Sequence, residues 1–343
     1  MTPRETVLAA LRREPVDCVP FTCYTGLMAP EAWEIENLIP VFSAGAYRTE
    51  LDGVEVKQSS RELEPGVRET TMETPWGTLT QVAHTETGYG SSWTKEHWIK
   101  RPEDYTIIEQ LTRHTKVIAD PEPVRATLEQ AGDRGVVLMW MGRTPFQRIW
   151  IEYAGMERLA FDLLDAPAAV EGLIDAFMEQ SREVIRATAT ADAMLVWVPD
   201  NITGEMTGPP IFRKYLTPYY REVCDILLPA GKLPCCHMDG MLRQIADCIG
   251  ETDLPVMEAF TPPPDGNFSV AEARDRWPEK ALWLNFPSSV HLQDPEGIAA
   301  VTRELVAQNA GRPGFLVGIT ENIPASVGAR SLQAIGGALN AER

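Results

Sequence analysis

The stretch Pro234-Cys235-Cys236-His237-Met238-Asp239-Gly240 reads as the end of a buried strand that breaks at Gly240, with a helix expected directly after it. Successive side chains of a strand point to opposite faces, so His237 and Asp239 should share one face and Cys236 should take the other. An imidazole and a carboxylate at this spacing can hold a metal ion or pass a proton. The alternative is a hydrogen-bonded pair that only orders the loop.

Other short apolar strands lie on both sides of this stretch, with helical segments between them. The expected strands are 19–24, 53–56, 136–140, 193–198, the strand that breaks at Gly240, 255–260, 281–286 and 314–319. The expected helices are 2–13, 29–44, 102–131, 145–188, 209–228, 241–250, 269–276, 295–309 and 325–340. Near-continuous apolar strands that alternate with helices indicate a parallel sheet covered on both faces. Eight such units predict a single-domain (β/α)8 TIM barrel over residues 1–343.

The residue pattern changes between about residues 60 and 100, where Thr, Glu and aromatic residues alternate. Turn signals occur there at Pro65-Gly66, Trp76-Gly77 and Gly88-Tyr89-Gly90. This pattern predicts a small β-meander inserted after the second barrel strand. A doubly wound open sheet is the alternative fold. No Gly-x-Gly-x-x-Gly follows the first strand, which counts against that sheet and against simple dinucleotide binding.

Composition narrows the class of partner. The net charge of −18 argues against nucleic acid or an anionic membrane and leaves a small-molecule substrate, with a homodimer still open. No run of about 18 apolar residues is present, so no membrane span is expected. The start of the chain also lacks the apolar core of a signal peptide. Six cysteines without a Cys-x-x-Cys pair fit a reduced, cytoplasmic compartment.

Polar residues gather where the predicted strands end, which is where the active site of a (β/α)8 barrel lies. They are Tyr24, Arg143, Asp200, Asn201, His237, Asp239, Glu258, Asn285, Glu321 and Asn322. Strand interiors in this chain are apolar, so packing alone does not require this concentration of polar groups. Six of these residues are expected to act in catalysis or substrate binding: Tyr24, Arg143, Asp200, Asn201, Glu258 and Asn285.

His237, Asp239 and Glu321 are the expected metal ligands, with Glu258 and Cys236 in reserve. Three nitrogen and oxygen ligands with one open position suit a catalytic zinc ion. The same carboxylate-rich set would accept a harder ion such as manganese or iron(II).

Structural roles remain open for several of these residues. Glu321 could cap a helix, because Pro324 marks a helix start shortly after it. Glu258 could bond to a neighbouring strand end. Arg143 could hold a substrate carboxylate through two parallel hydrogen bonds, or pair with an acidic loop.

Several segments resemble the uroporphyrinogen decarboxylase superfamily. They are the opening 4–15 closed by Val19-Pro20, Phe212-Arg213-Lys214-Tyr215 with Pro218-Tyr219-Tyr220, the His237 strand, and Asn285-Phe286-Pro287. The resemblance covers nearly the whole chain and implies a (β/α)8 barrel. The superfamily holds true decarboxylases, which need no cofactor, and corrinoid-linked methyltransferases, which bind zinc.

True decarboxylases carry Met-Arg-Gln-Ala-Gly-Arg after the first strand, and its arginines hold the carboxylates of the porphyrinogen. Here the corresponding segment is Tyr24-Thr25-Gly26-Leu27-Met28-Ala29, without an arginine. An acidic chain without those arginines is poorly suited to an octacarboxylate. The chain therefore resembles the methyltransferase branch more closely.

The methyltransferases use His-x-Cys on the fifth strand and a Cys shortly before a proline after the eighth. His237 matches the first ligand, whereas Asp239 and Glu321 stand where the two cysteines would be. Carboxylates leave a harder Lewis acid than thiolates do, better suited to an ether, hydroxyl or amine. The resemblance therefore implies a zinc-dependent demethylase that passes a methyl group from a small O- or N-methylated substrate to a corrinoid on a partner protein, or to a similar acceptor. Transfer to a thiol such as coenzyme M is left without support.

Two other functions remain open. One is a decarboxylase or lyase acting on a small carboxylic acid that Arg143 and the metal hold. The other is a non-catalytic barrel that binds a corrinoid protein or a small ligand.

Overall fold

The computed structural model describes residues 1–86 and 92–341, so the turn expected at Gly88-Tyr89-Gly90 lies outside the described residues. The chain divides into two compact units. Unit 1 comprises Met1–Ala46, Pro121–Gly142 and Thr188–Arg343, and unit 2 comprises Tyr47–Asp120 and Arg143–Ala187.

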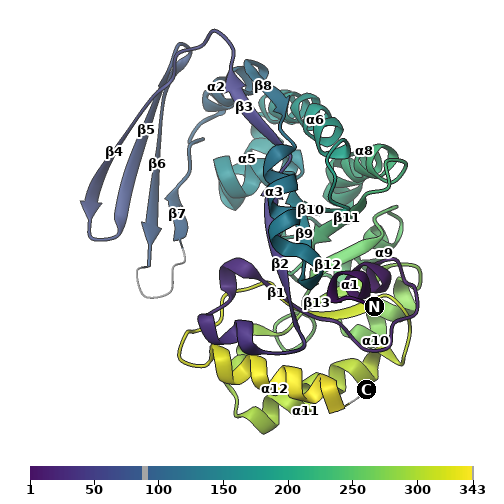
Figure 1. The fold of residues 1–343 in the computed structure, drawn as a ribbon. Helices are drawn as coiled ribbons and strands as arrows, with labels where there is room; N and C mark the ends of the chain where they lie inside the picture. The colour runs from purple at the N-terminus through teal and green to yellow at the C-terminus, as the bar shows by residue number, and fades with distance from the viewer. Residues whose placement is uncertain (87–91, 342–343) are drawn as a thin grey trace. The chain divides into compact units, whose positions relative to one another are not determined.

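Unit 1 contains a closed barrel of parallel strands in the order β1-β14-β13-β12-β11-β10-β9-β2. All of these strands except β14 are labelled in Figure 1. The strands are β1 (Phe21–Tyr24), β2 (Leu38–Gly45), β9 (Val136–Trp140), β10 (Leu195–Val198), β11 (Leu233–His237), β12 (Val256–Phe260), β13 (Ala281–Asn285) and β14 (Phe315–Ile319). This arrangement confirms the predicted TIM barrel. Strand residues from around the barrel form one core cluster that includes Val41, Leu138, Leu195, Val256 and Leu316. Burial of these side chains is the main force that closes the barrel.

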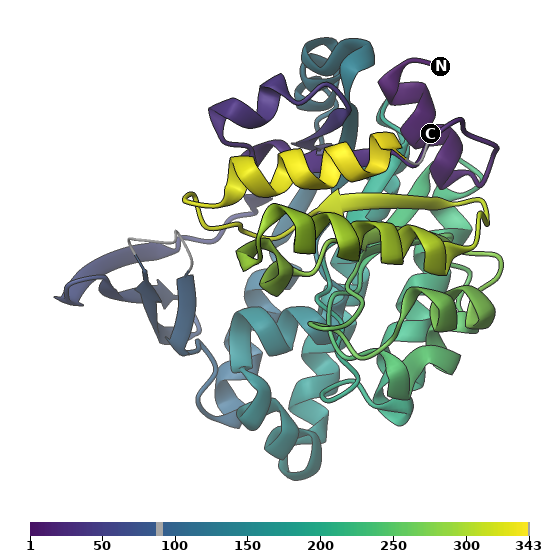
Figure 2. The same ribbon diagram turned by 90° about the horizontal axis from the view of Figure 1, so that it is seen from below.

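Helices alternate with the strands along most of unit 1. They are α1 (Pro3–Leu11), α3 (Glu122–Ala131), α7 (Pro209–Ile211), α8 (Thr217–Leu227), α9 (Ala246–Gly250), α10 (Val270–Arg276), α11 (Pro295–Asn309) and α12 (Gly328–Ala341), with a π-helix (Phe212–Leu216) between α7 and α8. Thr2 caps α1 as expected, forming a capping box with Glu5. The last two helices, α11 and α12, lie side by side (Figure 2).

The second barrel strand differs from the prediction. Residues 29–44, expected to be helical, form a short 3-10 helix (Pro30–Glu34) followed by β2, and residues 53–56 are not a barrel strand. Pro40 lies within β2 and has no N–H, which is unfavourable inside a helix. Because β2 is buried between β1 and β9, burial outweighs the helix-like spacing of its apolar residues.

Unit 2 holds the predicted insertion. An antiparallel sheet in the order β4-β5-β6-β7 consists of β4 (Lys57–Glu64), β5 (Val67–Thr74), β6 (Gly77–Thr85) and β7 (Ser92–Glu96). A second, two-stranded sheet pairs β3 (Tyr47–Leu51) with β8 (Thr115–Ala119). The helices are α2 (Pro102–Arg113), α4 (Pro145–Arg148), the π-helix η4 (Ile149–Ala154), α5 (Met156–Asp165) and α6 (Pro167–Ala189). The helix expected over 102–131 is therefore interrupted, because β8 pairs with β3.

Helix length and hydropathy bear on the predicted absence of a membrane span. Within residues 1–86 and 92–341, no helix combines the length and the apolar character that crossing a bilayer requires.

Candidate metal centre

His237 is the last residue of β11 and is almost fully buried, with 3% of its surface exposed. In the sheet it pairs with Glu258 of the neighbouring strand β12. The backbone N–H of Met238 donates to the carbonyl of Glu258 at 2.8 Å, which continues the pairing past the end of β11. His237 therefore stands at the end of the barrel where active sites of this fold form.

Glu258 lies within an irregularity in β12. The register with β13 shifts between Met257 and Phe260, and Ala259 has a φ of 54°. An irregularity of this kind re-aims the side chains next to it. Glu258 is completely buried, and its carboxylate contacts the imidazole of the adjacent strand.

Three donors surround the Glu258 carboxylate. Nδ1 of His237 lies 2.8 Å from Oε2, and the indole Nε1 of Trp197 donates to Oε2 at 2.7 Å. The hydroxyl of Tyr24 donates to Oε1. With Nδ1 of His237 directed at a carboxylate, Nε2 is the nitrogen left to bind a metal ion.

Nε2 of His237 faces the other two predicted ligands. It lies 3.5 Å from Oδ2 of Asp239 and 3.5 Å from Oε1 of Glu321. The three ligand atoms all lie within 4.8 Å of one another. The structure therefore brings together His237, Asp239 and Glu321, although Glu321 comes from the loop after β14.

The spacing of these atoms fits a small divalent cation. Ligand atoms placed tetrahedrally at about 2.1 Å from zinc are about 3.4 Å from one another. The two separations of 3.5 Å at Nε2 match that value. One imidazole and two carboxylates can thus hold zinc or a harder divalent ion with little rearrangement.

Charge and burial set the protonation preferences of the cluster. Burial alone would lower the pKa of His237, but the Glu258 charge and bonds to Asp239 and Glu321 raise that pKa well above its ordinary value. Burial would raise the pKa of Asp239, yet hydrogen bonds from His237 and Asn201 lower it overall. Burial, together with Glu258, raises the pKa of Tyr24, so its hydroxyl stays protonated.

Asn201 fixes the position of Asp239. Its side-chain Nδ2 donates to Oδ2 of Asp239 at 3.0 Å. The residue follows β10 and has a φ of 50°, in the left-handed region that asparagine tolerates better than most residues. The predicted site residue Asn201 therefore lies beside a predicted metal ligand.

Asp200 and Cys236 lie in a separate buried contact. The hydroxyl of Tyr220 donates to Oδ2 of Asp200 at 2.6 Å. Sγ of Cys236 lies 3.6 Å from that hydroxyl and 3.9 Å from Oδ2 of Asp200. Cys236 thus takes the face opposite His237, as the strand alternation predicts.

Asn285 connects three strand ends. Its Nδ2 donates to Oγ1 of Thr261 at 3.3 Å, and its Oδ1 accepts from the N–H of Thr320 at 3.2 Å. These bonds join the segments that follow β12 and β14 to the end of β13. Arg143 belongs to unit 2, where its Nη1 lies 3.8 Å from Oε1 of Glu152.

Trp197 is a site residue that the sequence reasoning missed. It lies within the apolar strand β10, and its ring contacts those of Tyr24 and His237 at centroid distances of 5.8 and 5.7 Å. The available signal was the indole N–H, because a buried tryptophan usually requires a hydrogen-bond acceptor.

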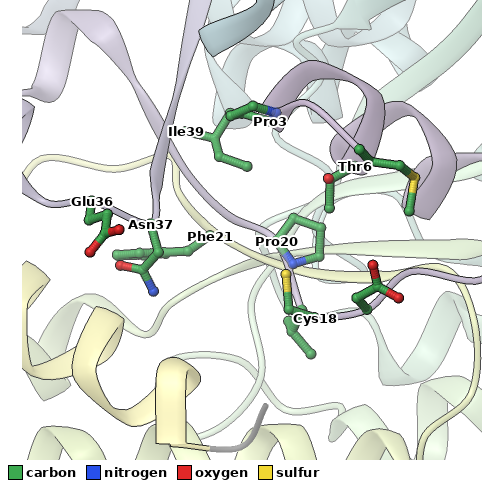
Figure 3. A pocket seen from close by; sticks show the side chains of 11 residues that line it. Pro3, Thr6, Cys18, Pro20, Phe21, Glu36, Asn37 and Ile39 are labelled. Atoms are coloured by element: carbon green, nitrogen blue, oxygen red, sulfur yellow. The ribbon is translucent and has the colours of Figure 1, made fainter.

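A hollow of about 410 Å³ lies at the amino-terminal end of β1, and none of the predicted site residues lines it. Pro3 and Thr6 of α1, Cys18 and Pro20 before β1, and Asn37 are among the residues that line it (Figure 3). The amino-terminal end of a TIM barrel is associated with stability rather than with catalysis.

Family membership follows from the sequence. The sequence profile described as "Uroporphyrinogen decarboxylase (URO-D)" matches residues 151–338, which is more than half of the chain. The chain therefore belongs to the uroporphyrinogen decarboxylase family. No curated protein matches it.

Solved structures give the same fold. The chain is similar to a methyltransferase from Methanosarcina mazei, with 14% identity, a TM-score of 0.63, and coverage of 100% of this chain and 99% of that one. It is less similar to a protein described as a vitamin-B12 independent methionine synthase from Listeria monocytogenes, with 16% identity, a TM-score of 0.42, and coverage of 63% and 66%. The first likeness spans both chains and supports the barrel as the shared fold.

Proposed function

We propose that this protein is a metal-dependent demethylase that moves a methyl group from a small O- or N-methylated substrate to a corrinoid, or a similar acceptor, carried by a partner protein. The observation that carries the proposal is the orientation of His237. Glu258 occupies Nδ1, while Nε2 faces Asp239 and Glu321 at 3.5 Å. The full-length likeness to a protein named a methyltransferase supports the same reaction class.

The chain's own residues have distinct tasks. His237, Asp239 and Glu321 would hold the ion, which we propose to be zinc or another divalent metal. When bound, the ion supplies Lewis acidity toward the oxygen or nitrogen of the substrate. Glu258 orients the imidazole and raises its basicity, since a carboxylate on Nδ1 strengthens Nε2 as a ligand.

The reaction balances as a transfer of a methyl cation equivalent. The bond between the methyl carbon and the substrate oxygen or nitrogen breaks, and the electron pair remains on that heteroatom, which takes up a proton. The methyl carbon forms its new bond to the nucleophilic acceptor. The hard donor set of one imidazole and two carboxylates favours a heteroatom of this kind over a thiol.

A decarboxylase or lyase acting on a small acid is the second candidate, because the chain belongs to the uroporphyrinogen decarboxylase family. Uroporphyrinogen itself is a poor candidate substrate. The segment after β1, Tyr24-Thr25-Gly26-Leu27-Met28-Ala29, offers no arginine for its carboxylates.

Elemental analysis and a transfer assay test the proposal. Protein purified without chelators is expected to hold about one divalent metal ion per chain. His237→Ala and Glu321→Ala should each lose it while His114→Ala, a histidine of unit 2, keeps it. The loaded enzyme should methylate free cob(I)alamin from a methoxyphenol or a methylamine.

Two results would contradict the proposal. Metal-free wild-type protein that cannot be loaded with zinc would exclude the metal centre. Turnover of uroporphyrinogen with no methyl transfer would favour the decarboxylase instead.

A further inference from the structure

Two arginines of unit 2 converge on one glutamate. Nη1 of Arg143 lies 3.8 Å from Oε1 of Glu152, and Nε of Arg148 lies 3.4 Å from Oε2 of the same side chain. Arg148 ends α4, and Glu152 lies on the π-helix η4 that follows it. Short π-helical segments are frequent at functional sites.

Arg148 is held rigidly in this cluster. Its Nη1 donates to Oε1 of Gln180 at 2.8 Å, and its Nη2 donates to the hydroxyl of Tyr153 at 3.3 Å. Its guanidinium carbon lies 4.1 Å from the centre of the Phe177 ring. A guanidinium fixed by bonds and by stacking loses little conformational freedom when an anion binds to it.

Glu152, by contrast, is held loosely. Its distances of 3.8 and 3.4 Å to the two arginines exceed those of charge-assisted hydrogen bonds, which are about 2.7–2.9 Å. Its side chain is 40% exposed, compared with 22% for Arg143 and 27% for Arg148. The glutamate can therefore leave toward solvent while Arg148 stays in place.

Tyr47 completes the surroundings of the cluster. Burial raises its pKa to about 12, and that pKa also responds to Arg148, which lowers it, and to Glu152, which raises it. The phenol is therefore within electrostatic range of both charged groups and stays protonated.

We propose that this cluster is a binding site for the carboxylate group of a small organic acid, and that Glu152 occupies it when no ligand is present. Guanidinium groups bind carboxylates through paired N–H donors, and the side chain that Arg143 and Arg148 share is itself a carboxylate. The ligand's carboxylate displaces Glu152 into solvent. No metal ion takes part, so the site is independent of the function proposed for unit 1.

Because Glu152 competes with an external acid for the two arginines, its removal should have a distinctive effect on binding. The apparent affinity for an external acid is reduced by the fraction of time for which Glu152 occupies the arginines. If that fraction is about nine-tenths, removing the competing charge strengthens binding about tenfold. Loss of an acidic side chain should thus improve the binding of an anion at this site.

Calorimetric titration with benzoate tests this proposal, with every variant made in a His237→Ala background so that benzoate cannot bind to a metal in unit 1. Glu152→Gln should lower the dissociation constant about tenfold. Glu157→Gln removes the same charge from α5 and should leave the constant unchanged. Adding Arg148→Gln or Arg143→Gln to Glu152→Gln should abolish the gain.

Equal affinities for Glu152→Gln and Glu157→Gln would overturn the proposal, because the gain would then reflect net charge alone. A gain that survives both arginine substitutions would overturn it too, by placing the benzoate elsewhere. The metal content of the wild-type protein affects neither result, so the two proposals fail independently.

Discussion

At the scale of single residues, the candidate centre depends on two unusual backbone conformations. Asn201 follows β10 and Ala259 lies in β12, and these two strands flank β11 in the barrel. Each residue has a positive φ, which costs about 1–2 kcal/mol for a non-glycine residue. Asn201 directs its amide at Asp239, and Ala259 follows Glu258, which contacts His237. Such strain persists where the surrounding structure requires it, often at functional sites.

Asn201→Gly tests the role of the Asn201 side chain, because it removes the amide while the backbone conformation can stay the same. Glycine accepts the positive φ, so the fold should remain intact and the midpoint of thermal unfolding should change little. The hydrogen bond to Asp239 is lost, and we expect zinc affinity, measured by competition with a chelator, to fall about 10- to 100-fold. Ala310→Gly is the matched control, because Ala310 has a φ of 52° at the end of α11. Wild-type affinity in Asn201→Gly would show that the amide does not position Asp239.

Residues whose side chains commonly bind metal ions are the part of the site that the sequence predicts. His237, Asp239 and Glu321 were predicted as one set because polar groups at the ends of barrel strands converge. Trp197 was missed because an indole within an apolar strand looks like packing until its acceptor is known. The contact between Asn201 and Asp239 was equally out of reach, since it depends on a positive φ that local sequence does not specify.

At the scale of secondary-structure elements, the bounds of a helix were predicted correctly where residues at its ends favour starting or stopping a helix. Helix α11 has the bounds expected for it, and in the structure Asp294 caps it and Pro295 opens it. The prediction failed for β2, where a helix was expected, because its apolar residues also fit a helical spacing. Whether they became strand was decided by non-local pairing with β1 and β9, which a local window does not contain.

The packing of α12 against the segment after β13 makes stability depend on pH. His291 is buried there, with Nδ1 2.6 Å from Oγ of Ser331 on α12. Burial lowers its pKa from 6.5 to about 4. Between these pH values the unfolded chain binds a proton that the folded chain does not. The His291 contribution to the free energy of unfolding therefore falls as pH decreases through this window, by about 3 kcal/mol in all.

Urea unfolding between pH 4 and 6.5 checks this expectation. His291→Gln should show a weaker loss of stability on acidification than the wild-type protein. Ser331→Ala removes the partner but keeps the buried imidazole, so it should lower stability at every pH while keeping the wild-type slope. Parallel slopes for His291→Gln and the wild type would exclude His291 as the source.

At the scale of the whole molecule, the candidate ligands connect distant parts of the barrel of unit 1. His237 and Asp239 come from the end of β11, whereas Glu321 follows β14, and β12 and β13 lie between these two strands. An ion held by all three would link strand ends that share no backbone pairing. Ligand binding to the folded state alone stabilises it, by about 2.7 kcal/mol at a free concentration of 100 times the dissociation constant.

The division into two units sets where that stabilisation should be visible. Hydrogen exchange measured by mass spectrometry, with and without saturating zinc, should slow in peptides that cover residues 233–241 and 315–323 of unit 1. The β4–β7 sheet belongs to unit 2 and holds none of the three ligands, so its exchange should stay constant. His237→Ala should remove the zinc effect from both unit 1 peptides at once, because one ion requires the ligands from both segments. Protection of the 233–241 peptide alone would mean that Glu321 does not bind the metal, and protection across β4–β7 would mean that zinc acts through another site.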